Sequence, residues 1–173
     1  MIPSPQAAPL LRIAAPPGTG KTTVLPHLVG LARGRAVVAD IDEILEDGSL
    51  LGVPIAVPEA APIWPAYDRL WSRIAGFVRR AGVPVILLVQ VPDPGDPDGD
   101  GVLLGWELED AVRGRRLRDR GEPETVIAGA REDAAVLRGL VPADRLLRSS
   151  ETDTPEQAAT GLWRLAEPLL PRG

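Results

Sequence analysis

Apolar residues in this chain gather into five short runs that are separated by longer segments. The runs lie at residues 10–15, 35–40, 83–91, 102–108 and 144–148. The run at 83–91 shows no alternation of apolar and polar positions, which is expected for a strand buried on both faces of a parallel sheet. Each run is therefore predicted to be a β-strand.

The segments between these runs mostly carry helical periodicity. The clearest is 64–81, where one face collects Tyr67, Leu70, Trp71, Ile74, Phe77 and Val78. Further helices are predicted at 21–33, 109–120 and 123–140 and from Thr154 onward, while 43–62 is predicted to be a loop. Strands that alternate with helices imply an α/β fold of three layers, in which a parallel sheet of about five strands has helices on both faces.

Length and charge narrow the classes of protein that fit. A chain of 173 residues suits one domain, and we expect residues 1–173 to form it. The net charge of −5 argues against broad binding to nucleic acid or membrane surfaces, and no apolar run approaches the roughly 18–20 residues of a membrane helix. With no cysteine and no secretory signal at the N-terminus, we expect a cytoplasmic monomer or homodimer without nucleic-acid or membrane partners.

A glycine-rich segment between the first strand and the first helix matches a phosphate-binding loop. Residues 15–22, Ala-Pro-Pro-Gly-Thr-Gly-Lys-Thr, fit G-x-x-x-x-G-K-[ST] at every fixed position but the first. Backbone N–H groups of such a loop wrap the β-phosphate at the positive end of the helix, the lysine reaches the β- and γ-oxygens, and the threonine hydroxyl binds magnesium. The predicted nucleotide-binding residues are Pro17, Gly18, Thr19, Gly20, Lys21, Thr22 and Thr23.

Lysine usage supports this interpretation. Arginine occurs 18 times, whereas Lys21 is the single lysine. The position keeps a slim ammonium group on a flexible stem where a phosphate-binding loop needs it, instead of a broad guanidinium.

The same loop sequence opens many AAA+ ATPases, but the remainder of the chain differs from them. Those proteins carry an acidic pair at the end of a later strand, where this chain has Gln90-Val91. The second strand instead ends in Asp40-Ile41-Asp42, which predicts two carboxylates at the edge of the sheet where ligands bind.

With this loop and these carboxylates the chain resembles the small P-loop kinases: shikimate kinase, gluconate kinase, chloramphenicol phosphotransferase and the nucleoside monophosphate kinases. The resemblance implies a P-loop NTPase fold that uses ATP and Mg²⁺. It assigns magnesium to Thr22 and Asp40, makes Asp40 the candidate base and Asp42 an acceptor contact, and adds Lys21 to the catalytic groups.

The resemblance also implies an arginine-rich lid after the fourth strand, at about 109–123. Arg113, Arg116 and Arg120 are spaced i, i+3 and i+7, so they share one helix face. One or two of them are expected to neutralise charge on the transferring phosphoryl group, with a basic helix face in solvent as the alternative.

Two other features of the sequence bear on which acceptor is bound. Trp64 and Tyr67 open the helix that follows the variable loop and are candidates for stacking on an acceptor ring, with core packing as the alternative. The acidic segment 92–101 matches the spacing of an EF-hand calcium loop with Glu107 in the twelfth position, but it follows a strand instead of a helix. We expect it to be a loop at the edge of the active site, able to select a cationic or polyhydroxyl acceptor.

The sequence thus predicts a magnesium-dependent enzyme that moves the γ-phosphoryl group of ATP to a hydroxyl or phosphate of a small molecule. The alternative is a nucleotide-binding regulatory protein, or an ATPase of AAA-like type, that transfers nothing to a small molecule. The absence of an acidic pair beside Gln90 favours that alternative.

Overall fold

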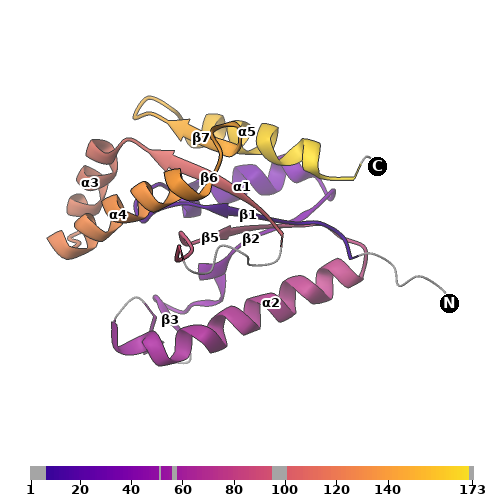
Figure 1. Cartoon of the computed structure of the whole chain (residues 1–173), viewed down its shortest axis with the longest axis horizontal. Helices are drawn as coiled ribbons and strands as arrows, with labels where there is room; N and C mark the ends of the chain where they lie inside the picture. The colour runs from indigo at the N-terminus through magenta and orange to yellow at the C-terminus, as the bar shows by residue number, and fades with distance from the viewer. Residues whose placement is uncertain (1–6, 51, 56–57, 95–100, 172–173) are drawn as a thin grey trace.

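The computed structural model describes residues 7–50, 52–55, 58–94 and 101–171. Its centre is a sheet of five parallel strands in the spatial order β2-β5-β1-β6-β7 (Figure 1). The strands are β1 (Leu10–Ala14), β2 (Val37–Asp40), β5 (Val85–Val89), β6 (Val102–Leu108) and β7 (Leu146–Ser149). All five coincide with the predicted apolar runs, so the α/β fold with a parallel sheet is confirmed.

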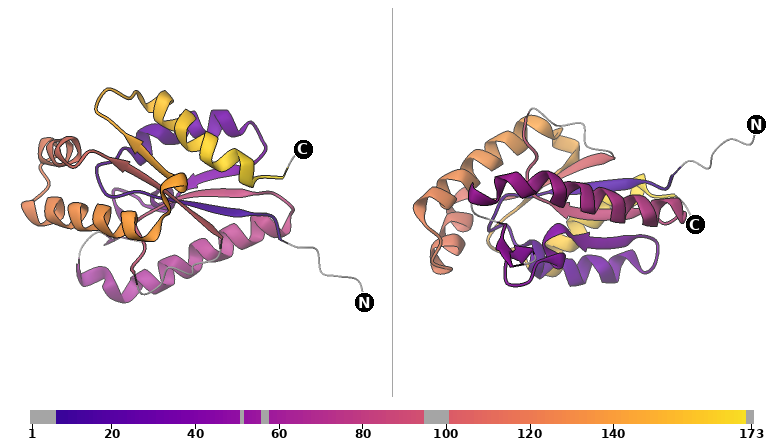
Figure 2. Two further views of the ribbon diagram at one scale, coloured as in Figure 1. Left: turned by 45° about the horizontal axis from the view of Figure 1, so that its top comes forward. Right: turned by 90° about the horizontal axis from the view of Figure 1, so that it is seen from below.

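Helices cover both faces of the sheet (Figure 2). One face is covered by α1 (Lys21–Ala32) and α5 (Pro155–Ala166) and the other by α2 (Trp64–Arg80) and α4 (Glu124–Leu140), with α3 (Asp110–Asp119) packed on α4. Strand β5, which lies between β2 and β1, explains this layering, because Ile86 and Leu88 join the core beneath α1 and α5 while Val85 and Leu87 pack beneath α2. Among the described residues, no helix is long and apolar enough to cross a membrane.

The segment predicted as a loop at 43–62 contains short ordered elements. In a small antiparallel hairpin, β3 (Ser49–Leu50) pairs with β4 (Val53–Pro54), and the turn that precedes β3 contains Asp47 and Gly48, both at positive φ. Short 3₁₀ helices lie at Ile41–Ile44, Pro58–Ile63, Ala143–Arg145 and Glu167–Leu169. Strands of two residues are too short for a period to appear in the sequence, so the pattern could not predict this hairpin.

The carboxyl ends of the parallel strands meet at one edge of the sheet, and the fold places the candidate site residues there. The phosphate-binding loop leaves β1 at that edge, Asp40 ends β2, and the chain turns into α3 and α5 beyond β6 and β7. Thr154 caps α5 reciprocally with Gln157, while Pro155 occupies the first helical turn, as the sequence predicted.

Candidate active site

The phosphate-binding loop is a tight turn that connects β1 to α1. The Thr19 hydroxyl donates to the carbonyl of Pro16 at 2.7 Å, and Gly18 and Gly20 adopt φ values of +81° and +118°. Glycine tolerates this left-handed backbone, which bends the loop around the amino end of α1. The first N–H groups of a helix have no partner within it, so they are available to an anion at this end.

Lys21 projects from the first turn of α1 into the edge of the sheet. Its side chain is buried, and Nζ lies 3.4 Å from the carbonyl oxygen of Val89 at the end of β5. Burial lowers the pKa of Lys21, and the nearby carboxylates of Asp40, Asp42 and Asp133 partly oppose that shift. The ammonium group is therefore poorly solvated, and the charges of three carboxylates partly compensate for its burial.

Asp40 is almost fully buried at the end of β2, with an exposed fraction of 3%. Burial raises the pKa of its carboxyl group above the ordinary 3.8, while Lys21 acts in the opposite direction. Its Oδ1 accepts from the backbone N–H of Asp42 at 3.1 Å, and Glu43 accepts from the N–H of Asp40 at 2.9 Å. These two bonds form a capping box that begins the 3₁₀ helix at Ile41–Ile44.

Asp42 lies at the same edge of the sheet as Asp40, but in a 3₁₀ helix and not in the expected strand-end arrangement. The strand stops at Asp40, so the two carboxylates are not set side by side by strand alternation, and Asp42 lies exposed in the first turn of the 3₁₀ helix. The pKa of Lys21 and that of Tyr67 both respond to the charge of Asp42, which places it near the two of them. The amide of Gln90, which follows β5, donates to Asp42 Oδ2 at 3.3 Å.

The aromatic candidates at the start of α2 differ in exposure. Tyr67 is buried and its hydroxyl donates to the carbonyl of Ile41, to which the indole N–H of Trp71 also donates at 2.9 Å. Burial is the largest influence that raises the pKa of Tyr67 to about 12. Tyr67 therefore stabilises the turn that carries Asp42. Its burial fits packing in the core, the alternative to stacking on an acceptor ring. Trp64 is 43% exposed and donates through Nε1 to Ile55 at 3.0 Å, beside the hairpin.

The three arginines on the α3 face lie at different depths. Arg113 is 1% exposed, and its guanidinium donates to the carbonyls of Leu108 and Ala130 and to Asp110 at 2.6–3.0 Å. It thereby joins the end of β6, α3 and α4, so its catalytic assignment is not supported by its contacts. Arg116 Nη1 instead donates to the carbonyl of Thr19 in the phosphate-binding loop at 3.1 Å.

Arg113→Met is expected to lower the free energy of unfolding by about 2–4 kcal/mol, because buried carbonyl groups would lose their donor. Urea unfolding of the variant checks this result. Arg115→Met is the matched control on the same helix, since Arg115 is paired with Glu151 at the exposed surface, and it should change stability by less than about 1 kcal/mol. Equal stability of the two variants would contradict the structural role of Arg113.

The base of α3 packs directly on the phosphate-binding loop at Gly18. A Cβ atom added to Gly18 would lie 2.9 Å from Cγ of Arg113 and 2.9 Å from Cγ of Leu117. The predicted lid segment at 109–123 thus packs on the loop through Arg113 and Leu117 of α3. This contact also explains why the loop needs glycine there, independently of its positive φ.

Gly18→Ala is therefore expected to destabilise the protein by about 1–3 kcal/mol, since both the backbone conformation and the contact oppose a side chain. Gly30→Ala is the control, because an added Cβ in α1 meets nothing within 4 Å and alanine favours a helix by about 1 kcal/mol. Thermal unfolding should move in opposite directions for the two variants. A Gly18→Ala protein as stable as the wild type would contradict the close packing of α3 on the loop.

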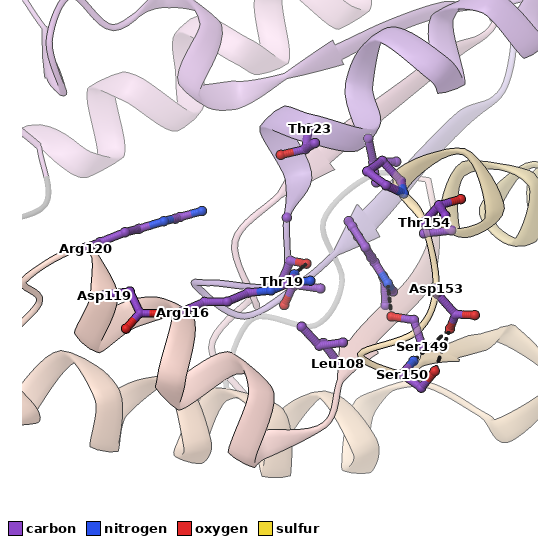
Figure 3. Close-up of a pocket in the computed structure, with 15 residues that line it drawn as sticks. Thr19, Thr23, Leu108, Arg116, Asp119, Arg120, Ser149, Ser150, Asp153 and Thr154 are labelled. Atoms are coloured by element: carbon purple, nitrogen blue, oxygen red, sulfur yellow. Dashed lines mark hydrogen bonds between the residues drawn. The ribbon is translucent and has the colours of Figure 1, made fainter.

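A cavity of about 360 Å³ opens beside the phosphate-binding loop (Figure 3). Arg116 and Arg120 extend toward it from α3, and Ser149, Ser150 and Asp153 form the wall opposite them. The indole of Trp106 donates to the Ser149 hydroxyl at 2.8 Å and forms part of the lining. The space adjoins Thr19 and Gly20, so a nucleotide whose phosphates occupy the loop could place its base here.

The wall formed after β7 was missed at the level of sequence. The turn at 149–154 carries four hydroxyl side chains and two carboxylates immediately after a predicted strand. The carboxyl ends of parallel strands share one edge of the sheet, where ligands bind. The position of these polar residues directly after a predicted strand could therefore have marked them as site residues. It was overlooked because no fixed-spacing motif marks the segment.

The structure describes the last residue of the calcium-loop spacing, Glu107, but only part of the acidic segment 92–101. Residues 95–100 lie outside the described residues. Glu107, the twelfth position of the calcium-loop spacing, accepts from Arg138 Nε and Arg148 Nε at 2.9 Å each. Its hydrogen bond with Arg138 is the main influence that raises the pKa of that arginine. The Glu107 carboxylate is thus engaged by two guanidinium groups.

No family model matches the sequence, and a search of curated proteins finds no match. Solved structures do match over nearly the whole chain. A sugar kinase from Janibacter superposes with a TM-score of 0.60 at 18% identity, covering 92% of this chain and 95% of that one. Shikimate kinase from Acinetobacter baumannii, in complex with shikimate, gives 0.59 at 17% identity, with coverage of 94% and 93%.

The APS kinase of Mycobacterium tuberculosis, in complex with AMPPNP and APS, gives a TM-score of 0.56 at 17% identity and covers 94% of this chain and 99% of that one. At such identities the likeness concerns the fold. The five-stranded parallel sheet with helices on both faces agrees with it. This chain has the fold of the small P-loop kinases.

Proposed function

We propose that this protein is a magnesium-dependent phosphotransferase that moves the γ-phosphoryl group of ATP to a hydroxyl or phosphate of a small molecule. The observation that carries the proposal is that Lys21 and Asp40 both lie at the end of β5. Lys21 Nζ is 3.4 Å from the carbonyl oxygen of Val89, and Asp40 is the register partner of Leu88 in the neighbouring strand. Each of the two buried groups also shifts the pKa of the other toward its charged form, as expected for opposite charges at a single reacting centre.

Lys21 and Asp40 divide the chemistry between them. The acceptor oxygen attacks the γ-phosphorus, the bond from that phosphorus to the β–γ bridging oxygen breaks, and ADP leaves with the bond's electron pair. The acceptor's proton passes to the Asp40 carboxylate, whose raised pKa makes it a better base than an ordinary aspartate. Lys21 balances charge on the phosphate oxygens throughout.

Arg116 and Arg120 are the arginines that we propose for the nucleotide. Arg116 already contacts the loop at Thr19, and both line the cavity. A guanidinium there is suited to stack on a base or to neutralise phosphate charge. The lid assignment for 109–123 would then apply only to the residues after Leu117, among them Arg120.

The donor set fits magnesium. Thr22 lies exposed in the first turn of α1, and Asp40 uses only Oδ1 in the capping box. Hydroxyl and carboxylate oxygens are the hard ligands that Mg²⁺ prefers, and it commonly binds through one or two of them together with substrate phosphates. Thr22 would hold the ion, with Asp40 as a further ligand if its carboxylate serves the metal instead of acting as the base; the ion would supply charge neutralisation at the phosphates.

The acceptor would bind on the other side of Asp40, near Asp42 and Trp64. Carboxylates accept hydrogen bonds, so Asp42 suits an acceptor that presents hydroxyl or ammonium groups. Trp64 is the exposed aromatic side chain available for stacking at this end of α2.

The test is an acceptor panel of shikimate, D-gluconate, D-glucose, APS, chloramphenicol and tunicamycin. ADP release is measured with wild-type protein and magnesium-ATP, with and without each compound. Release that depends on one of them supports the proposal. Tight ATP binding without acceptor-dependent release for any compound would favour the nucleotide-binding regulator, which the neutral side chain of Gln90 at the end of β5 also fits.

A further inference from the structure

Gln90 occupies a position between the two halves of the candidate site. It directly follows β5, which pairs with β2 on one side and with β1 on the other. The preceding residue, Val89, supplies the carbonyl oxygen that Lys21 approaches. An acidic side chain in this place would face the carboxylates at the end of β2, whereas glutamine offers an N–H donor to them.

The donor is used. Gln90 Nε2 lies 3.3 Å from Oδ2 of Asp42, while the backbone N–H of Asp42 is bonded to Oδ1 of Asp40 at 3.1 Å. Asp42 is thus held at two points, its backbone by Asp40 and its carboxylate by Gln90. The bond to Gln90 engages Oδ2 of this exposed carboxylate, and Oδ1 of Asp42 remains for another donor.

We infer that Gln90 is a positioning residue that orients the Asp42 carboxylate toward the acceptor. This inference rests on the proposed function, in which Asp42 contacts the acceptor. It explains why an amide serves at the end of β5, because glutamate has no N–H group and would repel both Asp42 and Asp40. The role of Gln90 is to act through Asp42 without touching the reacting atoms.

The kinetic test compares Gln90→Leu, Asp42→Ala and the double variant, using the panel compound that wild-type protein phosphorylates. Gln90→Leu should raise the acceptor KM about fivefold to tenfold, the effect of losing one hydrogen bond to a charged group, with kcat and the KM for ATP nearly unchanged. The double variant should match Asp42→Ala alone, because the effect of Gln90 passes through the Asp42 carboxylate, which alanine removes. Gln90→Glu should raise KM more than Gln90→Leu does.

An unchanged KM in Gln90→Leu, or an effect that adds in full to that of Asp42→Ala, would overturn the inference. A second readout needs no acceptor: the side-chain amide NMR signals of Gln90 should shift in Asp42→Ala and stay in place in Asp144→Ala, an exposed control. Signals of Gln90 that are the same in Asp42→Ala as in the wild type would also overturn it. A wild-type protein that phosphorylates no panel compound would instead count against the proposed function, so the two failures are distinguishable.

Discussion

Lys21→Met is expected to reduce phosphoryl transfer by at least about 10³-fold, because no other lysine exists to approach the β- and γ-oxygens. Methionine keeps the length and apolar stem of the side chain and removes only the charge. Since burial lowers the pKa of Lys21, the folded protein tolerates the ammonium poorly, and the variant should be no less stable than the wild type. Steady-state kinetics and thermal unfolding measure both effects.

Arg164→Met is the control for loss of a positive charge, because Arg164 is exposed on α5 at the surface of the protein. It should leave transfer unchanged. The single lysine also allows a direct occupancy measurement: acetic anhydride should acylate Lys21, and magnesium-ATP should slow that acylation, as read by mass spectrometry of the peptide that contains it. A Lys21→Met protein with wild-type turnover would contradict the assignment.

Asp40→Asn is expected to lower kcat by about 10²- to 10⁴-fold, the usual contribution of a general base. The amide oxygen of asparagine can still accept from the N–H of Asp42, so the turn after β2 should persist and ATP affinity should change little. Asp144→Asn, at an exposed site far along the chain, should behave as the wild type. Equal kcat for the two variants would remove Asp40 from the chemistry.

The pH dependence gives Asp40 a second test. A base works only when it is deprotonated, so activity should fall as the pH drops through the pKa of Asp40. Because burial raises that pKa, the fall should be centred above the ordinary value of 3.8. The acidic limb should disappear in Asp40→Asn, and a limb that persists there would belong to another group.

The fold was largely predictable because its elements are long and strongly patterned. The five strands are apolar runs, and α2 buries Tyr67 and Trp71 of its predicted apolar face. The other large members of that face, Leu70, Ile74 and Phe77, are exposed. The loop at 15–22 was predictable for a different reason, since phosphate binding imposes fixed positions on glycine, lysine and threonine. The hairpin at β3 and β4 was not predicted, because each strand has two residues.

The spacing of residues along the sequence could not predict how deeply each side chain is buried. Arg113, Arg116 and Arg120 share a helix face, yet Arg113 is sealed between α3 and α4 while Arg116 reaches the loop. Tyr67 is buried under the turn that carries Asp42. Helical periodicity gives the direction of a side chain, but the packing of neighbouring elements decides whether it meets solvent or carbonyl groups.

The transfer of label from ATP tests the central claim most directly. Wild-type protein is incubated with magnesium and ATP that carries radioactive phosphorus in the γ position, together with each compound of the acceptor panel. We predict that label appears in one phosphorylated acceptor with wild-type protein and is absent with Asp40→Asn and Lys21→Met. Label recovered only as ATP and inorganic phosphate, for every acceptor, would contradict a phosphotransferase function.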